Sequence, residues 1–253
     1  MAHYNKGVKY NHMERYNSAV YLIIDDNSIL RPLGVLVLRD SRHDLMPALK
    51  EFVEEVPGRH GEINFGNKLS SRLLELHVAS MDGLTPEQKE AVQREFAKYL
   101  NPLAGPKNLV FLDDPGKTYI VKYAGKIDPT EYADWMEFVI PFKAIKPYIV
   151  GSSEKKFSGS GTLTNNVNVE TPIIIEILGE VTDPSITFGT YTLVYIGTIP
   201  TGQKLIVDTE KKTAKLNGVN VLDNWSGGFP KLQPGNTSVT ADNNVTFKWR
   251  ERW

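Results

Sequence analysis

The chain has 253 residues, of which 41% are hydrophobic and 23% charged, a balance that is ordinary for a folded, soluble protein. Its formal net charge of −1 excludes the strongly basic field of a dedicated nucleic-acid binder. It has no cysteine, which excludes disulfides, thiolate metal sites and a cysteine nucleophile. The polar N-terminus lacks the apolar core of a secretory signal, and no window reaches the roughly 18–20 apolar residues of a membrane helix, so we expect no membrane insertion.

The first elements in chain order are two apolar runs that predict β-strands, AVYLIIDD (19–26) and RPLGVLVLRD (31–40). The next stretch, DLMPALKEFVEEVPGR (44–59), has apolar residues at helical spacing, so it predicts a helix that Asp44 caps. Two extended segments follow, EINFGN (62–67) and SRLLELHVAS (71–80), and the second alternates buried-type with polar residues.

The strongest helix signal of the chain lies at residues 85–100. Thr85 is a suitable N-cap, Pro86 fits the first helical position, and Gln88 completes a capping box. Asn101 precedes Pro102 and therefore ends the helix, because a residue before proline is pushed out of the α region. The apolar stripe of this helix consists of Val92, Phe96, Tyr99 and Leu100.

Three further runs predict strands with polar turns between them: NLVFL (108–112), TYIVKYAGKI (118–127) and DWMEFVIPFKAI (134–145). The first half therefore predicts a β-rich α+β domain with one main helix. Between the first two runs, FLDDPGKT (111–118) ends like a phosphate-binding loop, but Phe111 stands where that loop needs glycine, and a strand follows instead of a helix. We interpret it as a β-turn that joins two strands.

The composition changes near residue 150. The segment GSSEKKFSGSGTLTNN (151–166) is rich in Gly, Ser, Thr and Asn and predicts a linker or long loop. From about Val167 onward, short strand-like runs alternate with turns, which indicates a β-sandwich. The pair Asn217-Gly218 is a strong hairpin signal. We therefore expect two domains, residues 1–150 and residues 151–253.

No catalytic or metal-binding motif is complete in this sequence, so we expect no cofactor, no metal site and no enzyme activity. None of the five histidines pairs at the spacing of a helical zinc site. A second near miss to a phosphate loop, GTIPTGQK (197–204), has Gln203 where lysine is required. Adjacent carboxylates on a strand point to opposite faces, so such a pair does not converge on one substrate. The sequence does not exclude a glycosidase whose two catalytic carboxylates are far apart in the chain. The histidines are His3, His12, His43, His60 and His77.

A different class of function, a carbohydrate-binding module for host cell-surface glycans, is the alternative that the sequence leaves open. In a β-sandwich, exposed aromatic residues such as Trp225, Phe229 and Tyr191 could stack on sugar rings. Large aromatic residues are more often part of the core, which is the competing interpretation of the same three positions.

The order of motifs across both halves resembles the siphophage distal tail proteins (Dit). In the first half, a Pro-Gly-Arg-x-Gly turn in VPGRHGEINFGN, one helix, NLVFLDDPGKTYIVKYAGKI and EFVIPFKAIKPY follow in the order seen in that family. In the second half, TPIIIEILG, GQKLIVDTEKKTAKLNGVNV, GGFPKLQPGNTSV and the closing FKWRERW resemble its C-terminal galectin-like β-sandwich. The resemblance covers residues 30–253, and it conflicts with the helix predicted at 44–59, because this region is more often extended or irregular in the family.

This resemblance implies a structural, non-enzymatic role at the tip of a phage tail. Six copies of a β-sandwich-like N-terminal domain would form a ring that continues the tail tube and receives the tail-associated fibre or lysin protein. The galectin-like C-terminal domains would project outward and carry receptor-binding proteins. A head-to-tail interface closes such a ring when the rotation per subunit divides a full turn.

The same resemblance points to candidate structural and interface residues. Around the Pro-Gly-Arg-x-Gly turn, the glycines would supply backbone freedom, and Arg59 would either contact a neighbouring subunit or fold onto its own domain. In the loop of the C-terminal sandwich that begins at Phe229, Pro230 would fix the backbone, while Phe229 and Leu232 would fill the edge of the sandwich. Trp249 and Trp253 would share one face if the last strand persists, as core or interface anchors. The ring candidates are Gly58, Arg59, Gly61, Asp113, Asp114, Pro115 and Gly116, and the sandwich candidates are Phe229, Pro230, Leu232, Trp249 and Trp253.

Overall fold

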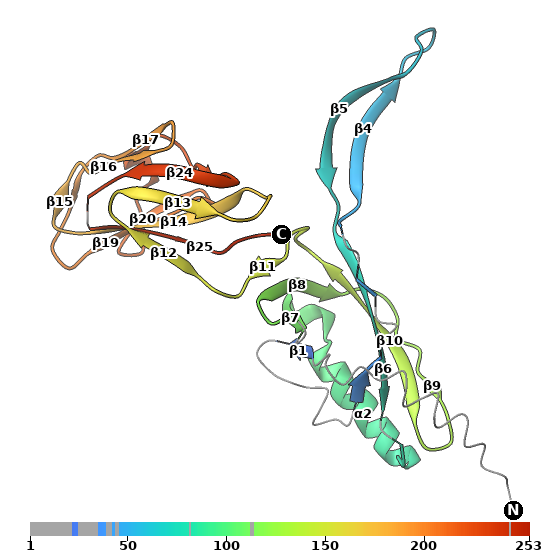
Figure 1. Cartoon of the computed structure of the whole chain (residues 1–253). Helices are drawn as coiled ribbons and strands as arrows, with labels where there is room; N and C mark the ends of the chain where they lie inside the picture. The colour runs from blue at the N-terminus through green and yellow to red at the C-terminus, as the bar shows by residue number, and fades with distance from the viewer. Residues whose placement is uncertain are drawn as a thin grey trace, which may run out of the picture. The chain divides into compact units, whose positions relative to one another are not determined.

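The computed structural model describes residues 22–24, 35–38, 42–43, 46–80, 82–111, 114–242 and 244–253, with the backbone alone for 22–24 and 42–43. The chain divides into two compact units, Met1–Ile149 and Val150–Trp253 (Figure 1). Strands dominate both units, and α2 (Pro86–Tyr99) is the one α-helix among the described residues. The predicted fold class, mainly β with one main helix, is confirmed.

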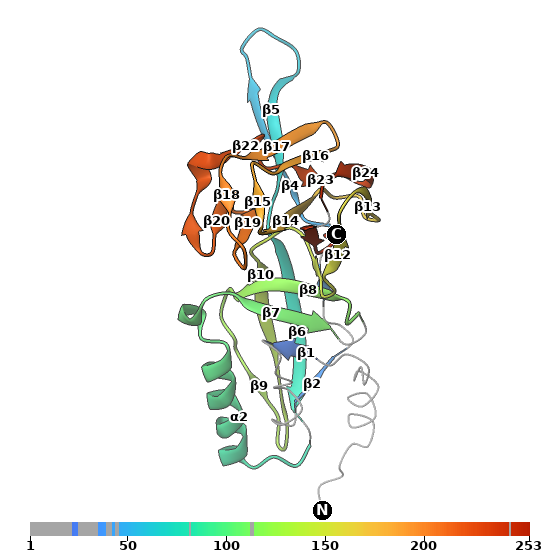
Figure 2. The same cartoon turned by 90° about the vertical axis from the view of Figure 1, so that its left-hand side faces the viewer.

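The N-terminal unit is built on an antiparallel sheet with the strand order β1-β7-β8-β10-β6-β2 (Figure 2). Its longest pairing joins β6 to β10, from Arg72 opposite Ala144 to Ala79 opposite Glu137. Alternate residues along both strands are buried, because successive side chains of a strand point to opposite faces. The bounds are β1 (Leu22–Ile24), β2 (Val35–Val37), β3 (Arg42–His43), β6 (Arg72–Ser80), β7 (Lys107–Phe111), β8 (Lys117–Tyr123), β9 (Thr130–Glu131) and β10 (Met136–Ala144).

Helix α2 begins where the capping chemistry predicts. Thr85 Oγ1 accepts a hydrogen bond from the backbone N–H of Gln88 at 3.3 Å, and Gln88 Oε1 accepts one from the N–H of Thr85 at 2.9 Å. On its buried side, the Phe96 ring meets Phe138 of β10 edge to face, with centroids 5.2 Å apart. The buried Lys89 ammonium donates to the backbone carbonyls of Tyr132 and Ala133, which ties the helix to the loop before β10. A short 3-10 helix, η1 (Pro102–Ala104), follows.

The helix predicted at residues 44–59 is wrong. The structure has strand β4 (Leu49–Glu55) there, paired with β5 (Glu62–Leu69) in a two-stranded sheet of its own. The apolar positions that suggested a helical stripe do not face a core, and pairing with β5 satisfies the backbone instead. Phe and Val favour strands, so the local propensity agreed with the structure more than the periodicity did. Asp44, the predicted cap, lies outside the described residues.

The C-terminal unit is a β-sandwich of two antiparallel sheets. One sheet has the order β12-β25-β14-β19-β20-β21 with β23 beside β14, and the other has the order β13-β24-β16-β17-β22. Their inner faces share one core that includes Ile175, Phe188 and Phe247, each almost fully buried. The strands of the first sheet are β12 (Lys155–Ser158), β14 (Thr171–Leu178), β19 (Lys204–Asp208), β20 (Thr213–Leu216), β21 (Val219–Asn220), β23 (Lys231–Leu232) and β25 (Val245–Trp249).

Shorter elements complete this unit. The Asn217-Gly218 hairpin is confirmed, because both residues have positive φ, at 48° and 90°, and Leu216 pairs with Val219 across the turn. The remaining elements are β11 (Val150–Gly151), β13 (Gly161–Asn165), β15 (Val181–Thr182), β16 (Ser185–Phe188), β17 (Tyr191–Tyr195), β18 (Thr198–Ile199), η2 (Leu222–Asn224), β22 (Trp225–Ser226) and β24 (Gly235–Thr240).

The linker predicted at residues 151–166 is also wrong, because β12 and β13 occupy most of it. The two strands belong to different sheets, so this small-residue segment crosses from one face of the sandwich to the other. Leu163 is fully buried and Phe157 packs against the core. Gly161 lies so close to the Phe157 ring that a Cβ there would come within 2.5 Å of it. Glycine is therefore used for close packing in this segment, not for flexibility.

Candidate functional site

The most exposed structured part of the N-terminal unit is the hairpin β4–β5, residues Leu49 to Leu69, which we call the arm. Figure 1 shows the arm extending beyond the sheet that holds β6. Every residue of the two strands is exposed except Ile63, which is half-buried. No other described strand pairs with β4 or β5. An isolated two-stranded hairpin is marginally stable in water, so the arm has the character of a segment that needs a partner.

The arm carries large apolar side chains on its surface. Phe65 is 66% exposed and Phe52 is 42% exposed, although aromatic residues are usually buried. A contiguous run of exposed apolar side chains marks an interaction site more often than a free surface. The exposed large apolar residues of the arm are Leu49, Phe52, Val53, Val56, Phe65 and Leu69.

Local contacts shape the arm without burying these side chains. A β-bulge interrupts the register between Glu51 and Val53, and Gly66 in the facing strand has a φ of +130°. Asn64 Oδ1 accepts a hydrogen bond from the backbone N–H of Gly66 at 2.7 Å. The ammonium groups of Lys50 and Lys68 lie 5.6 and 5.4 Å from the centroid of the Phe52 ring. Such exposed cation–π contacts contribute about 0.5–1 kcal/mol each, so they orient the ring without removing it from the surface.

The predicted Pro-Gly-Arg-x-Gly turn forms the tip of the arm. Gly58 and Gly61 have φ values of +82° and +87°, which L side chains rarely adopt, and the Arg59 N–H donates to the Val56 carbonyl at 3.0 Å. The Arg59 side chain is exposed, and its guanidinium makes no hydrogen bond or ion pair with another described residue. The three candidates from this motif therefore lie together, at the end of the arm.

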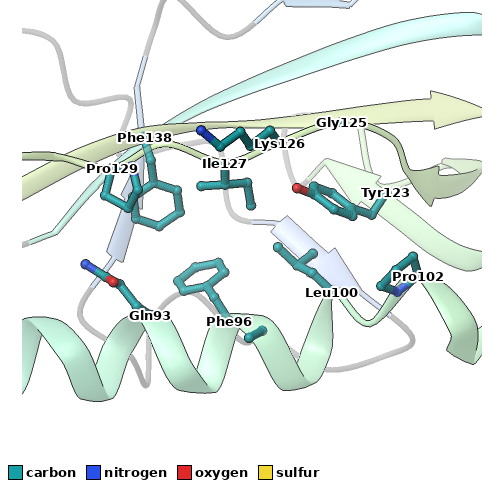
Figure 3. Close-up of a pocket in the computed structure, with 11 residues that line it drawn as sticks. Gln93, Phe96, Leu100, Pro102, Tyr123, Gly125, Lys126, Ile127, Pro129 and Phe138 are labelled. Atoms are coloured by element: carbon teal, nitrogen blue, oxygen red, sulfur yellow. The ribbon is translucent and has the colours of Figure 1, made fainter.

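A second feature of the N-terminal unit is an apolar cleft of about 450 Å³ beside α2, which we call the helix cleft. Figure 3 shows Phe96 pointing from α2 toward Ile127 and Phe138, and Leu100, the residue after α2, pointing toward Tyr123. Gln93 and Lys126 supply polar groups at its border. The other lining residues are Ala97, Pro102, Tyr123, Gly125 and Pro129.

The predicted turn at 111–118 joins β7 to β8, and its interpretation as a β-turn is confirmed. The N–H of Asp114 donates to the carbonyl of Phe111, and the N–H of Lys117 donates to that of Asp114, both at 3.1 Å. Lys117 Nζ also pairs with the Asp114 carboxylate at 2.8 Å. Asp114, Pro115 and Gly116 are exposed there, whereas Asp113 lies outside the described residues.

The sandwich candidates lie mostly in the core of the C-terminal unit. Pro230 and Leu232 are buried, and Phe229 packs against the core cluster. Trp249 is 7% exposed, but β25 ends at this residue, so Trp253 does not continue its face. The Trp253 ring instead lies against Gly151.

The aromatic residues weighed for sugar stacking do not form one exposed platform. Trp225 is 9% exposed, and its indole N–H donates to the Gly228 carbonyl at 2.9 Å. Phe229 packs on the same core, and only Tyr191 is exposed. Sugar rings stack on accessible aromatic faces, so this arrangement gives the carbohydrate-binding alternative no support.

Among the residues that the structure describes, no group of three or more His, Asp and Glu side chains could hold a metal ion. No described helix has the length and apolar character to cross a membrane.

Sequence reasoning missed both the exposed apolar residues of the arm and the helix cleft. A usable signal for the arm was present, because VPGRHG is a turn-forming segment between two strand-prone runs, which indicates a hairpin. The cleft had no such signal, since its lining comes from α2 and from the segment 123–138, and their spacing depends on the whole fold.

Two family models match this chain, one in each half. The phage tail protein RIFT-related domain matches residues 20–144, and the siphovirus-type tail component, C-terminal domain, matches residues 166–253. Together they cover most of the chain, and both describe tail components. The fold and these matches therefore define a structural component of a phage tail.

Solved structures share the fold. The crystal structure of the phage SPP1 Dit protein (gp 19.1) aligns over 92% of this chain and 99% of its own, with 16% identity and a TM-score of 0.80. Chains of the phage p2 baseplate in its activated conformation, with Sr or Ca, align over 92% of this chain and 98% or 97% of their own, with 10% identity and TM-scores of 0.50. No curated protein sequence matches. The chain belongs to the siphophage distal tail protein family.

Proposed function

We propose that this protein forms a hexameric ring at the tip of a phage tail, where it joins the tail tube to the tail-tip hub. Its partners would be other copies of itself, the tail tube protein and the tail-associated fibre or lysin protein, with receptor-binding proteins at the periphery. The location would be the virion tail tip. The names of the similar structures support this role, since one is described as a paradigm of hub adsorption apparatus in phages that infect Gram-positive hosts and the others are baseplates.

The proposal assigns the two parts of the chain different tasks. Residues 1–150 would form the ring, and residues 151–253 would be a separate β-sandwich domain available to peripheral proteins. The role is mechanical: the chain would act by holding other proteins in place, without a cofactor, without turnover, without sequence-specific nucleic-acid binding and without membrane insertion.

The observation that carries the ring proposal is the arm. Exposing several large apolar side chains on an otherwise unsupported hairpin is unfavourable, and burying each against a partner contributes about 1.5–3 kcal/mol. A ring offers every copy the same partner, namely its neighbour. Because a head-to-tail interface uses two different surfaces of one chain, a protruding arm on one side suits it well.

The mass of the purified protein in solution tests this proposal. We expect light scattering and native mass spectrometry to give a hexamer, alone or after addition of the tail tube protein, and negative-stain images to show rings. A protein that stays monomeric over the accessible concentration range, with and without the tube protein, contradicts the proposal. Deleting the outer arm, by replacing residues 52–66 with a short turn, should abolish assembly but leave the C-terminal unit folded.

A further inference from the structure

We propose that the helix cleft of one copy receives the arm of the neighbouring copy, with Phe65 as the main anchor. This inference rests on the proposed ring and names the two surfaces that meet in it. Each surface is apolar, exposed and unexplained by the fold of its own unit. One protrudes and the other is recessed, as a head-to-tail contact requires.

The first step of the argument is chemical complementarity. Large apolar and aromatic side chains line the cleft, and Phe96 and Phe138 already meet edge to face at its wall. A further aromatic ring can join such a pair in the same edge-to-face geometry, which adds an attraction beyond that of the buried area. The arm offers Phe65, its most exposed aromatic residue, and Phe52 on the facing strand. Interfaces often depend on an aromatic anchor in an apolar pocket.

The second step is that a chain cannot place its arm in its own cleft. The arm leaves the sheet at the start of β6, where Arg72 pairs with Ala144. The cleft begins beside Tyr123, whose partner Phe142 pairs with Leu74, and extends to Phe138, which pairs with Val78. Its near end is therefore two residues from Arg72 along β6 and its far end six, or roughly 20 Å at the rise of a strand. Figures 1 and 2 both show the arm running outward from the start of β6, in the direction away from α2, which lines the cleft. The arm therefore reaches a cleft only on another copy.

The third step is size. The arm contributes about 20 residues, which matches the roughly 20–30 residues per side of a stable protein interface. A cleft of about 450 Å³ is large enough for bulky side chains and too small for a folded domain. A small apolar ligand would also fit such a cleft, but it would leave the apolar surface of the arm uncovered.

Site-directed cross-linking tests this contact, because the natural chain has no cysteine. The probe pair is Asn67→Cys, an exposed position of β5 that leaves the anchor Phe65 in place, and Ala97→Cys on the exposed border of the cleft. The matched control pairs Asn67→Cys with Tyr99→Cys, which lies on the same helix about 200° away from Ala97. With a short bismaleimide, we expect the probe pair to give roughly tenfold more intermolecular product than the control, because docking raises the local concentration of the partner cysteine. Mixing the two single-cysteine probe variants should give cross-linked dimers and nothing larger.

A second variant keeps the test independent of the cross-linker. Ala97→Glu places a charge at the cleft and should abolish assembly, whereas Tyr99→Glu on the opposite face should not. Both are exposed helix positions and glutamate is a good helix former, so both monomers should keep their thermal midpoints.

The outcomes separate the two proposals. If the natural protein assembles, but the probe pair cross-links no better than the control and Ala97→Glu still assembles, the arm-to-cleft contact is wrong and the ring proposal stands. If the natural protein does not assemble even with the tail tube protein, both proposals fall. A third outcome is that the probe pair gives no cross-link and that assembly is lost only when a small apolar ligand is removed from the cleft. This outcome would assign the cleft to that ligand and contradict the arm-to-cleft contact.

Discussion

At the residue scale, Glu251 shows how one carboxylate holds the end of the chain in the C-terminal unit. It lies two residues beyond β25, where Lys155 Nζ contacts its Oε1 at 2.5 Å and the backbone N–H of Asn166 donates to the same oxygen at 3.0 Å. Burial on its own would raise the pKa of the Glu251 carboxyl, but these two donors hold that pKa below its usual value of 4.5. The charged form therefore stabilises the fold.

We predict that Glu251→Gln lowers the free energy of unfolding of the C-terminal unit by about 1–2 kcal/mol at neutral pH. Because the pKa is depressed in the folded state, this contribution is present above about 4.5 and is lost as pH falls through the folded-state pKa. Urea unfolding at about pH 7 and about pH 3.5, followed by tryptophan fluorescence, should show the difference between natural protein and variant shrinking at the lower pH.

The control for this prediction is Glu90→Gln on α2. Glu90 pairs with Arg94 at 2.6 Å, but both side chains are largely exposed, and exposed pairs contribute little. A loss of stability at neutral pH that is equal for both variants would contradict the role assigned to Glu251.

At the scale of elements, the crossing from β12 to β13, which lie in different sheets, depends on close packing at one glycine. A Cβ at position 161 would lie 2.5 Å from Cζ of Phe157, which is closer than real contacts allow. We predict that Gly161→Ala destabilises the C-terminal unit by about 1–3 kcal/mol, because the ring or the strand must shift. Thermal unfolding measures this loss. Gly202→Ala is the comparison for backbone strain alone, because a Cβ there meets no atom within 4 Å but the φ is +76°, whereas Gly161 has no positive φ.

For the arm we predict the opposite, because the proposed ring assigns its exposed side chains to assembly and not to the stability of the folded monomer. Phe65→Ser should leave the thermal midpoint of the dissociated protein almost unchanged, as for other exposed positions, while weakening assembly. Differential scanning calorimetry together with light scattering separates the two effects. A large loss of monomer stability would show that Phe65 packs within its own unit.

The elements that sequence analysis predicted well are those with local chemistry of their own. The helix at 86–99 was predicted from Thr85 and Gln88, and the Asn217-Gly218 hairpin from turn preference alone. The two errors, at 44–59 and 151–166, share a physical cause. In each, the surroundings of the segment decide which side chains are buried, and the spacing of apolar residues cannot report this when the segment faces no core or crosses between two sheets.

The candidate site was predictable only in part, because its exposure and shape also depend on surroundings that local sequence patterns do not report. The turn of Gly58, Arg59 and Gly61 could be found from its motif, but the motif does not say that the turn ends an exposed arm. The helix cleft depends on the distance between α2 and residues 123–138, which follows from sheet register and not from any local pattern.

At the scale of the whole molecule, the C-terminal unit has a complete core of its own. The buried cluster that joins its two sheets draws every member from residues 163–249. It contains Trp225 and Trp249, both buried, and the fragment 150–253 is of a size that folds alone in many proteins. The proposed assembly surfaces, by contrast, all lie within residues 1–149.

We therefore predict that residues 150–253 expressed alone fold cooperatively and stay monomeric under conditions in which the whole chain assembles. Burial of Trp225 and Trp249 should give blue-shifted fluorescence that moves to the red in a single urea transition, because a single core unfolds as one unit. Light scattering should give the monomer mass at every concentration, since neither the arm nor the helix cleft is present. A fragment that folds but forms hexamers would move the ring interface to the sandwich, whereas a fragment that does not fold would show that its core needs the N-terminal unit.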